Sequence, residues 1–178
     1  MGEKQFLNFD LLIDVTIGEF RARVIDSPAG HTSREFRLPF NRPELENFLL
    51  RLGALRQTTR HLNQQDQELS KRFGGALFET IISGTIQNCL AASLRAAGSQ
   101  GAGLRIRLRV ESSELASLPW EFLYHAGLDR FLCLSLDIPV SRYVTWPDHI
   151  PPLAIYPPLR VLAMISNPME GEYPPLDV

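Results

Sequence analysis

Residues 104–110 read LRIRLRV, and this stretch is the clearest strand in the sequence. Aliphatic and arginine side chains alternate along it, and a period of two is typical of a strand whose two faces meet different surroundings. The aliphatic face is expected to pack on a core. The arginine face, made of Arg105, Arg107 and Arg109, is expected to be solvated or paired across strands. Docking of an acidic partner is the alternative interpretation of this face.

Three more strands are expected before this one, at residues 6–15, 20–25 and 33–38. The first is rich in β-forming residues, and the next two alternate apolar and polar side chains. Turn-forming residues separate them at 16–19 and 26–30. The sequence therefore predicts a three-stranded antiparallel meander.

A helix is expected to begin at Asn41. Asn41 is a favourable N-cap, and Glu44 stands where its side chain can reach back to the N-cap backbone. Phe40 and Leu45 occupy the two positions of a hydrophobic staple. The apolar stripe that follows is interrupted at residues 63–66, where this helix is expected to have ended.

A second, longer helix is expected from near Phe73 to Ala97, because apolar residues recur at helical spacing throughout. Gly98 is expected directly after its end, where glycine is favoured. Gly74 and Gly75 weaken a helix and are expected to mark a kink or its true start. Strands and helices together predict an α+β fold of antiparallel strands with two helices.

The segment after residue 110 is expected to hold a short helical turn at 119–124 and strands at 131–136 and 140–144. These elements complete an α+β region that we place at residues 1–146.

A second domain is expected to start near the end of the sequence. Residues 147–158 are rich in proline and predict an extended linker. Residues 159–166 form a nearly continuous apolar run, which is typical of a central strand in an α/β sheet. Residues 159–178 are therefore interpreted as the start of a truncated second domain.

The composition narrows the class of protein. The 178 residues are 44% apolar and 21% charged, values that exclude wholesale disorder. Eighteen basic and 20 acidic residues give a net charge of −2, so nothing favours nucleic acid or an anionic membrane as partner. Polar residues interrupt the N-terminal apolar stretch, which argues against a secretory signal. Two cysteines cannot build a disulfide scaffold, so a cytoplasmic protein is expected.

No complete catalytic motif is present in the sequence. Cys89 and Cys133 have no neighbouring cysteine or histidine that would make a metal site or an activated nucleophile, and both are expected to be small buried hydrophobes. No cofactor and no metal are expected. Solvated surface positions are expected for the histidines: His31, His61, His125 and His149.

Four segments together resemble one known family. They read LPWEFLY at 118–124, FLCLS at 131–135, SRY at 141–143 and PLRVLAMISNP at 158–168. Their order and spacing resemble CHAT-domain proteins, caspase-like peptidases of the caspase/separase clan. The resemblance covers about residues 70–178, and LPWE is its most specific part.

The resemblance implies that the complete protein carries a His–Cys dyad on a caspase-like α/β sheet. In the family both dyad residues follow the first strand of that sheet, so no catalytic residue is assigned within these 178 residues. Cys89 and Cys133 precede that strand and are not the nucleophile.

Trp120, Glu121 and Arg142 are the candidate residues of a junction with the caspase-like domain. The simpler interpretation is a buried tryptophan anchor, with Glu121 capping a turn or pairing with an arginine such as Arg142.

The expected function is a scaffolding or regulatory N-terminal part of a CHAT cysteine peptidase, whose partner is the remainder of the caspase-like domain. The alternative is a non-catalytic module for protein–protein interaction, binding a separate protein or a second copy of itself. An enzyme complete within this sequence is the least favoured interpretation.

Overall fold

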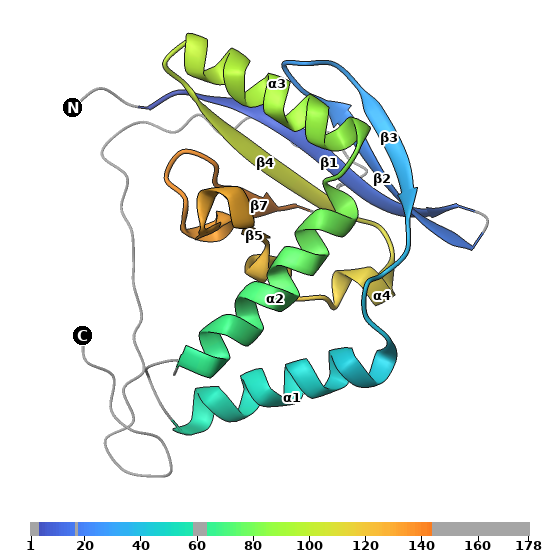
Figure 1. Ribbon diagram of the computed structural model, residues 1–178. Helices are drawn as coiled ribbons and strands as arrows, with labels where there is room; N and C mark the ends of the chain where they lie inside the picture. The colour runs from blue at the N-terminus through green and yellow to red at the C-terminus, as the bar shows by residue number, and fades with distance from the viewer. Residues whose placement is uncertain (1–3, 17, 59–63, 144–178) are drawn as a thin grey trace, which may run out of the picture.

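The computed structural model describes residues 4–16, 18–58 and 64–143, which form an α+β fold (Figure 1). Its elements in chain order are β1 (Phe6–Thr16), β2 (Glu19–Asp26), β3 (Thr32–Phe36), α1 (Arg42–Thr58), α2 (Gln64–Ile81), α3 (Thr85–Ser99), β4 (Gly103–Val110), α4 (Ser113–Ala116), η1 (Trp120–Phe122), β5 (Tyr124–His125), η2 (Ala126–Leu128), β6 (Arg130–Phe131), η3 (Leu132–Leu134) and β7 (Val140–Arg142).

The main sheet has five strands in the order β3-β2-β1-β4-β7. The predicted antiparallel meander is confirmed, because β2 pairs antiparallel with both β1 and β3. The sheet as a whole is mixed, however, since β4 runs parallel to β1 and β7 runs parallel to β4. The crossover from β3 to β4 passes through α1, α2 and α3, and a connection of this length lets β4 lie parallel to β1, which a hairpin could not do.

The core lies between one face of this sheet and α3, which packs on β1, β3 and β4 (Figure 1). The alternating residues Phe9, Leu11 and Ile13 of β1 point into it beside Ile106 and Leu108 of β4, and all five are buried. The predicted aliphatic face of residues 104–110 is thus confirmed as a core face. The arginine face looks to the opposite side of the sheet.

The predicted start of α1 is confirmed in detail. The Asn41 side-chain oxygen accepts a hydrogen bond from the Glu44 backbone N–H at 2.9 Å, and the Glu44 carboxylate accepts one from the Asn41 N–H at 2.9 Å. This reciprocal pair satisfies two backbone donors that a helix leaves without partners. Phe40 then stacks on Phe73 of α2, with ring centroids 4.4 Å apart.

The predicted long second helix is wrong, because the stretch forms two helices, α2 and α3. They meet at Gly84, whose φ of 57° is open to glycine but costly for other residues. The apolar spacing continues across the break because both helices contribute to the same core.

The predicted end of that helix is also corrected. Gly98 is helical, and the left-handed residue after α3 is Gly101, with a φ of 65°. The Ala102 N–H donates to the Ala97 carbonyl at 3.0 Å, and the Gly101 N–H donates to the Gly98 carbonyl at 3.1 Å. These two bonds are the Schellman arrangement, which satisfies carbonyls at a helix end.

Residues 131–136 do not form the predicted strand. Arg130 and Phe131 pair with β5 in a small hairpin, and the chain then turns through η3. Of the three leucines in this stretch Leu132 is buried, while Leu134 and Leu136 are exposed, so the apolar run does not serve one sheet face. The predicted helical turn near 119–124 is confirmed as η1, and the strand predicted at 140–144 contains β7.

The predicted linker at 147–158 and the predicted strand at 159–166 lie outside the described residues, as does the proposed domain start at 159–178. Among the helices of the described part of the chain, none has the length and apolar character needed to cross a membrane.

Candidate functional site

The segment around Trp120 is the most tightly packed of the predicted site residues. Trp120 is 1% exposed, and its indole N–H donates a hydrogen bond to the Leu115 carbonyl at 2.7 Å. Leu115 belongs to α4, which begins where the Ser112 hydroxyl accepts a hydrogen bond from the Leu115 N–H. Leu118 and Leu123 are buried in the same core cluster as Trp120. The expectation of a buried tryptophan anchor is therefore confirmed.

Arg142 connects the last described strand to this segment. One nitrogen of its guanidinium donates to the Glu121 carboxylate at 3.3 Å, and another donates to the Ala116 carbonyl at 2.7 Å. The predicted Glu121–Arg142 pair is thus confirmed. The ion pair itself contributes little to stability because both side chains are exposed. A role of these residues at a domain junction stays a prediction.

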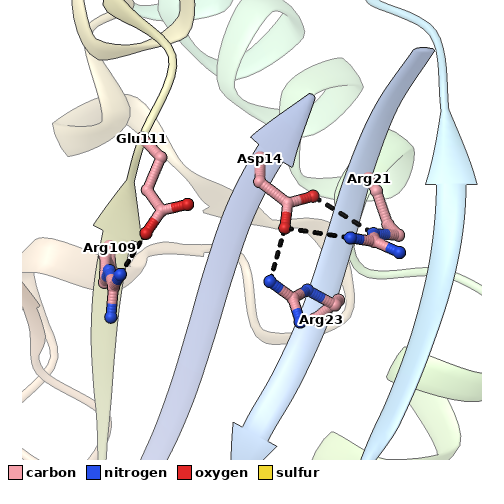
Figure 2. Close-up of polar contacts among 5 residues, drawn as sticks. All are labelled: Asp14, Arg21, Arg23, Arg109 and Glu111. Atoms are coloured by element: carbon pink, nitrogen blue, oxygen red, sulfur yellow. Dashed lines mark hydrogen bonds and ion pairs between the residues drawn. The ribbon is translucent and has the colours of Figure 1, made fainter. Parts of the chain in front are cut away.

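The arginine face of the sheet is internally paired. Two oxygens of Asp14 on β1 accept hydrogen bonds from Arg21 at 3.1 and 3.2 Å, and one also accepts from Arg23 at 2.6 Å (Figure 2). Burial by itself would raise the pKa of Asp14, but the hydrogen bonds and charges of the two guanidiniums lower it on balance. Asp14 therefore stays ionised at neutral pH.

The predicted arginine ladder of β4 continues this pattern. Arg107 is paired with the buried Asp10, and Arg105 donates to the Asn8 amide oxygen at 2.8 and 3.0 Å. Arg109 is paired with Glu111 (Figure 2). Pairing within the chain is thus confirmed for the ladder, and docking of an acidic partner is not needed to explain it.

Neither cysteine has the surroundings of an activated nucleophile. Cys89 is half-buried, and its Sγ atom lies 3.3 Å from the Ser27 hydroxyl. Cys133 is exposed, which corrects the expectation that it is buried, and the reason is that η3 replaces the predicted strand. Partial loss of solvent around the sulfur nevertheless raises the pKa of the Cys133 thiol, so the thiol is protonated at neutral pH.

The histidines are only partly described. His31 is exposed as predicted, whereas His61 and His149 lie outside the described residues. His125 is half-buried rather than solvated, because its ring packs on Phe78 with centroids 4.9 Å apart. Within the described ranges, no cluster of three or more His, Cys, Asp or Glu side chains could hold a metal ion.

Sequence reasoning missed a polar cluster on the β5–β6 hairpin. The Lys71 ammonium and the Tyr124 hydroxyl both donate to the Asp129 carboxylate, the former at 2.8 Å. Asp129 adopts a left-handed conformation with a φ of 43°, which an aspartate in a tight turn tolerates. The hydrogen bond to Asp129 raises the pKa of Tyr124, so this tyrosine is not a ready base. The cluster holds the hairpin against α2.

Sequence reasoning also missed a groove of about 970 Å³ between α1, α2 and Tyr124, called here the α1–α2 groove. Phe48 and Phe73 line its apolar part, and Gly75 and Ala76 line it with little side-chain volume. The only sign of it in the sequence is the pair of small residues Gly75 and Ala76. Helical spacing alone does not tell a groove lined by small residues from a face packed in the core.

Comparison with known proteins adds no family to this geometry: no family model, no curated protein and no solved structure matches the chain. The class of protein is therefore defined by the fold and site of the described residues alone. They form an α+β domain with a packed tryptophan segment, an internally paired arginine face and one large groove beside α1 and α2.

Proposed function

We propose that this chain is the N-terminal scaffolding and regulatory part of a caspase-like CHAT cysteine peptidase, acting in the cytoplasm, with a His–Cys dyad outside this sequence. The observation that carries the proposal is the packing of the LPWE segment, the most specific part of the resemblance. Trp120 in that segment is buried and hydrogen-bonded, and Glu121 beside it pairs with Arg142.

The position of Arg142 suggests how regulation would act. Arg142 ends β7, and its two hydrogen bonds fix that strand to η1 and to the end of α4. A displacement of whatever follows β7 would pull on these contacts and on the Trp120 segment. The chemistry of the described cysteines agrees with a dyad located elsewhere, because neither Cys89 nor Cys133 has a base beside it.

The test begins with the natural reading frame beyond residue 178. A downstream histidine and cysteine, each after an apolar strand, are expected, and the complete protein should cleave peptides from a fluorogenic library. Arg142→Ala in that protein should change the rate of cleavage. Arg105→Ala, on the arginine face of β4, should leave that rate unchanged. A stop codon directly after residue 178 would contradict the proposal.

A non-catalytic interaction module is the second candidate function. The α1–α2 groove favours it, because a cleft of this size lined by aromatic and charged side chains suits a bound polypeptide segment. This candidate predicts that the chain binds a partner without any downstream peptidase domain.

A further inference from the structure

We propose that the α1–α2 groove binds an extended peptide segment of a partner protein, in which a basic and an acidic residue stand four positions apart with an apolar residue midway between them. This inference does not depend on the peptidase assignment, because only described residues of α1, α2 and the neighbouring hairpin carry it. The groove volume of about 970 Å³ is at the upper end of what ligand sites offer.

The middle of the groove is apolar. Phe73 of α2 stacks on both Phe40 and Phe48, with centroid distances of 4.4 and 3.9 Å, so the aromatic side is held in place. Gly75 and Ala76 line the groove along α2 and are half-buried. Because these two residues project almost no side chain, an apolar side chain of a partner can reach the aromatic rings.

Four charged residues of the groove are separated by sign. On α1, Glu44 stands seven residues before Arg51, and on α2, Glu79 stands seven residues after Arg72. The two helices run in opposite directions (Figure 1), so both glutamates lie toward one end and both arginines toward the other. Seven residues of helix span about 10 Å, which sets the distance between the two charged ends.

These charges are available to a partner. Glu44, Arg51, Arg72 and Glu79 are all exposed. Within the part of the chain that the structure describes, no ion pair involves Arg51, Arg72 or Glu79. Glu44 uses one carboxylate oxygen for its helix cap. The glutamate end therefore keeps two negative charges to offer.

Two further charges border the arginine end. Lys71 is held by Asp129 and adds little there, whereas Glu68 lies one turn before Arg72 and offsets one positive charge. The arginine end thus keeps a net charge of about one positive unit. A partner with a basic residue toward Glu44 and Glu79, and an acidic residue toward Arg51 and Arg72, matches both ends.

The distance between the two charged ends of the groove favours a partner segment in an extended conformation. An extended chain advances about 3.3 Å per residue and turns every second side chain to the same face, so residues four positions apart share a face and span about 13 Å, which their long side chains adjust to the two ends of the groove. The apolar residue between them then faces the ring of Phe73 and the space over Ala76. Long-range attraction between opposite charges would also orient the segment before it docks.

The experiment titrates ¹⁵N-labelled residues 1–178 with the capped peptide Gly-Lys-Ser-Leu-Ser-Glu-Gly, in which Lys, Leu and Glu share one face of an extended chain. Its control has the same composition with adjacent charges, Gly-Ser-Leu-Ser-Lys-Glu-Gly. We expect saturable shifts at the amides of Gly75 and Ala76 with the first peptide, and binding at least about fivefold weaker with the control. Equal binding of both peptides, or no shifts along the groove, would overturn the proposal.

Matched variants test the charge pattern separately. Arg72→Glu and Glu79→Lys should each weaken binding about fivefold, since each replaces an attraction by a repulsion. Ala76→Trp should abolish binding by filling the groove. Arg95→Glu, on the exposed side of α3, makes the same charge change away from the groove and should have no effect. If Arg95→Glu weakens binding as much as Arg72→Glu, the attraction is non-specific and the proposal fails.

Discussion

Gly74 of α2 lies directly against the backbone carbonyl of Phe122, so close that the position has no room for a Cβ atom. The contact joins the middle of a helix to η1, which ends at Phe122 and includes the Trp120 and Glu121 residues of the LPWE segment. Gly74 and Gly75 lie inside α2 and mark neither its start nor the break between helices. The need for glycine at position 74 is therefore close backbone packing.

Gly74→Ala should destabilise the protein by about 1–3 kcal/mol, the usual cost of overpacking against atoms that cannot move aside. Gly75→Ala is the matched control, because its Cβ atom would lie 3.7 Å from the Tyr124 ring, an ordinary contact. Removing a glycine from a helix interior there should stabilise by about 0.5–1 kcal/mol. Urea unfolding measures both values, and similar effects at the two positions would contradict the packing described here.

The end of α3 gives a second paired prediction. Gly101→Ala should destabilise by about 1–2 kcal/mol because an alanine is strained at a φ of 65°. Gly98→Ala should stabilise by up to about 1 kcal/mol, since Gly98 is helical with nothing within 4 Å of its would-be Cβ atom. Thermal unfolding of the two variants tests whether the left-handed residue after α3 is Gly101 or Gly98. Stabilisation by Gly101→Ala would contradict the helix end described here and favour Gly98.

Trp120→Ala should destabilise by about 3–5 kcal/mol, the range for removing a large buried side chain. Trp120→Phe keeps most of the apolar area but leaves the Leu115 carbonyl without its hydrogen bond, so a smaller loss of about 1–3 kcal/mol is expected. Denaturant unfolding compares the two. A loss below about 1 kcal/mol for Trp120→Ala would place the ring on the surface and favour a binding role for it.

Asp14 makes the stability depend on pH in a defined direction. Its pKa is lowered in the folded protein, so its ionised form stabilises the fold above the unfolded pKa of about 3.9. That stabilisation is lost as the pH falls from about 4 through the folded pKa. Asp14→Asn should therefore destabilise at pH 7, and the difference from the parent protein should narrow below pH 4.

Urea unfolding between pH 7 and pH 2.5 measures this dependence. Glu68→Gln, at an exposed carboxylate of α2, controls for the loss of one negative charge and should change little at any pH. A constant difference between Asp14→Asn and the parent protein across the whole range would show that Asp14 acts by packing and not by its charge.

The parts of the fold that were predictable are those held by nearby residues. The Asn41–Glu44 cap is formed within four residues, and the alternation at 104–110 is visible in one strand. The parallel pairing of β1 with β4 was not predictable, because it joins residues such as Asp10 and Arg107 that lie 97 positions apart. Local pattern carries no information about which distant strand becomes the neighbour.

The candidate site shows the same division. The burial of Trp120 followed from its residue type, and the pairing of Glu121 with Arg142 from their opposite charges. The break at Gly84 was hidden because one apolar stripe serves two helices. The α1–α2 groove was hidden because it arises only where the two helices and Tyr124 meet.

The central claim, that this chain is the non-catalytic part of a caspase-like peptidase, is tested most directly by one assay of peptide cleavage. Residues 1–178 and the product of the complete reading frame are incubated with the same fluorogenic peptide library. We expect turnover by the complete protein alone. Turnover by residues 1–178 that is lost in Cys89→Ala or Cys133→Ala would contradict the claim, because it would place a working nucleophile inside this chain.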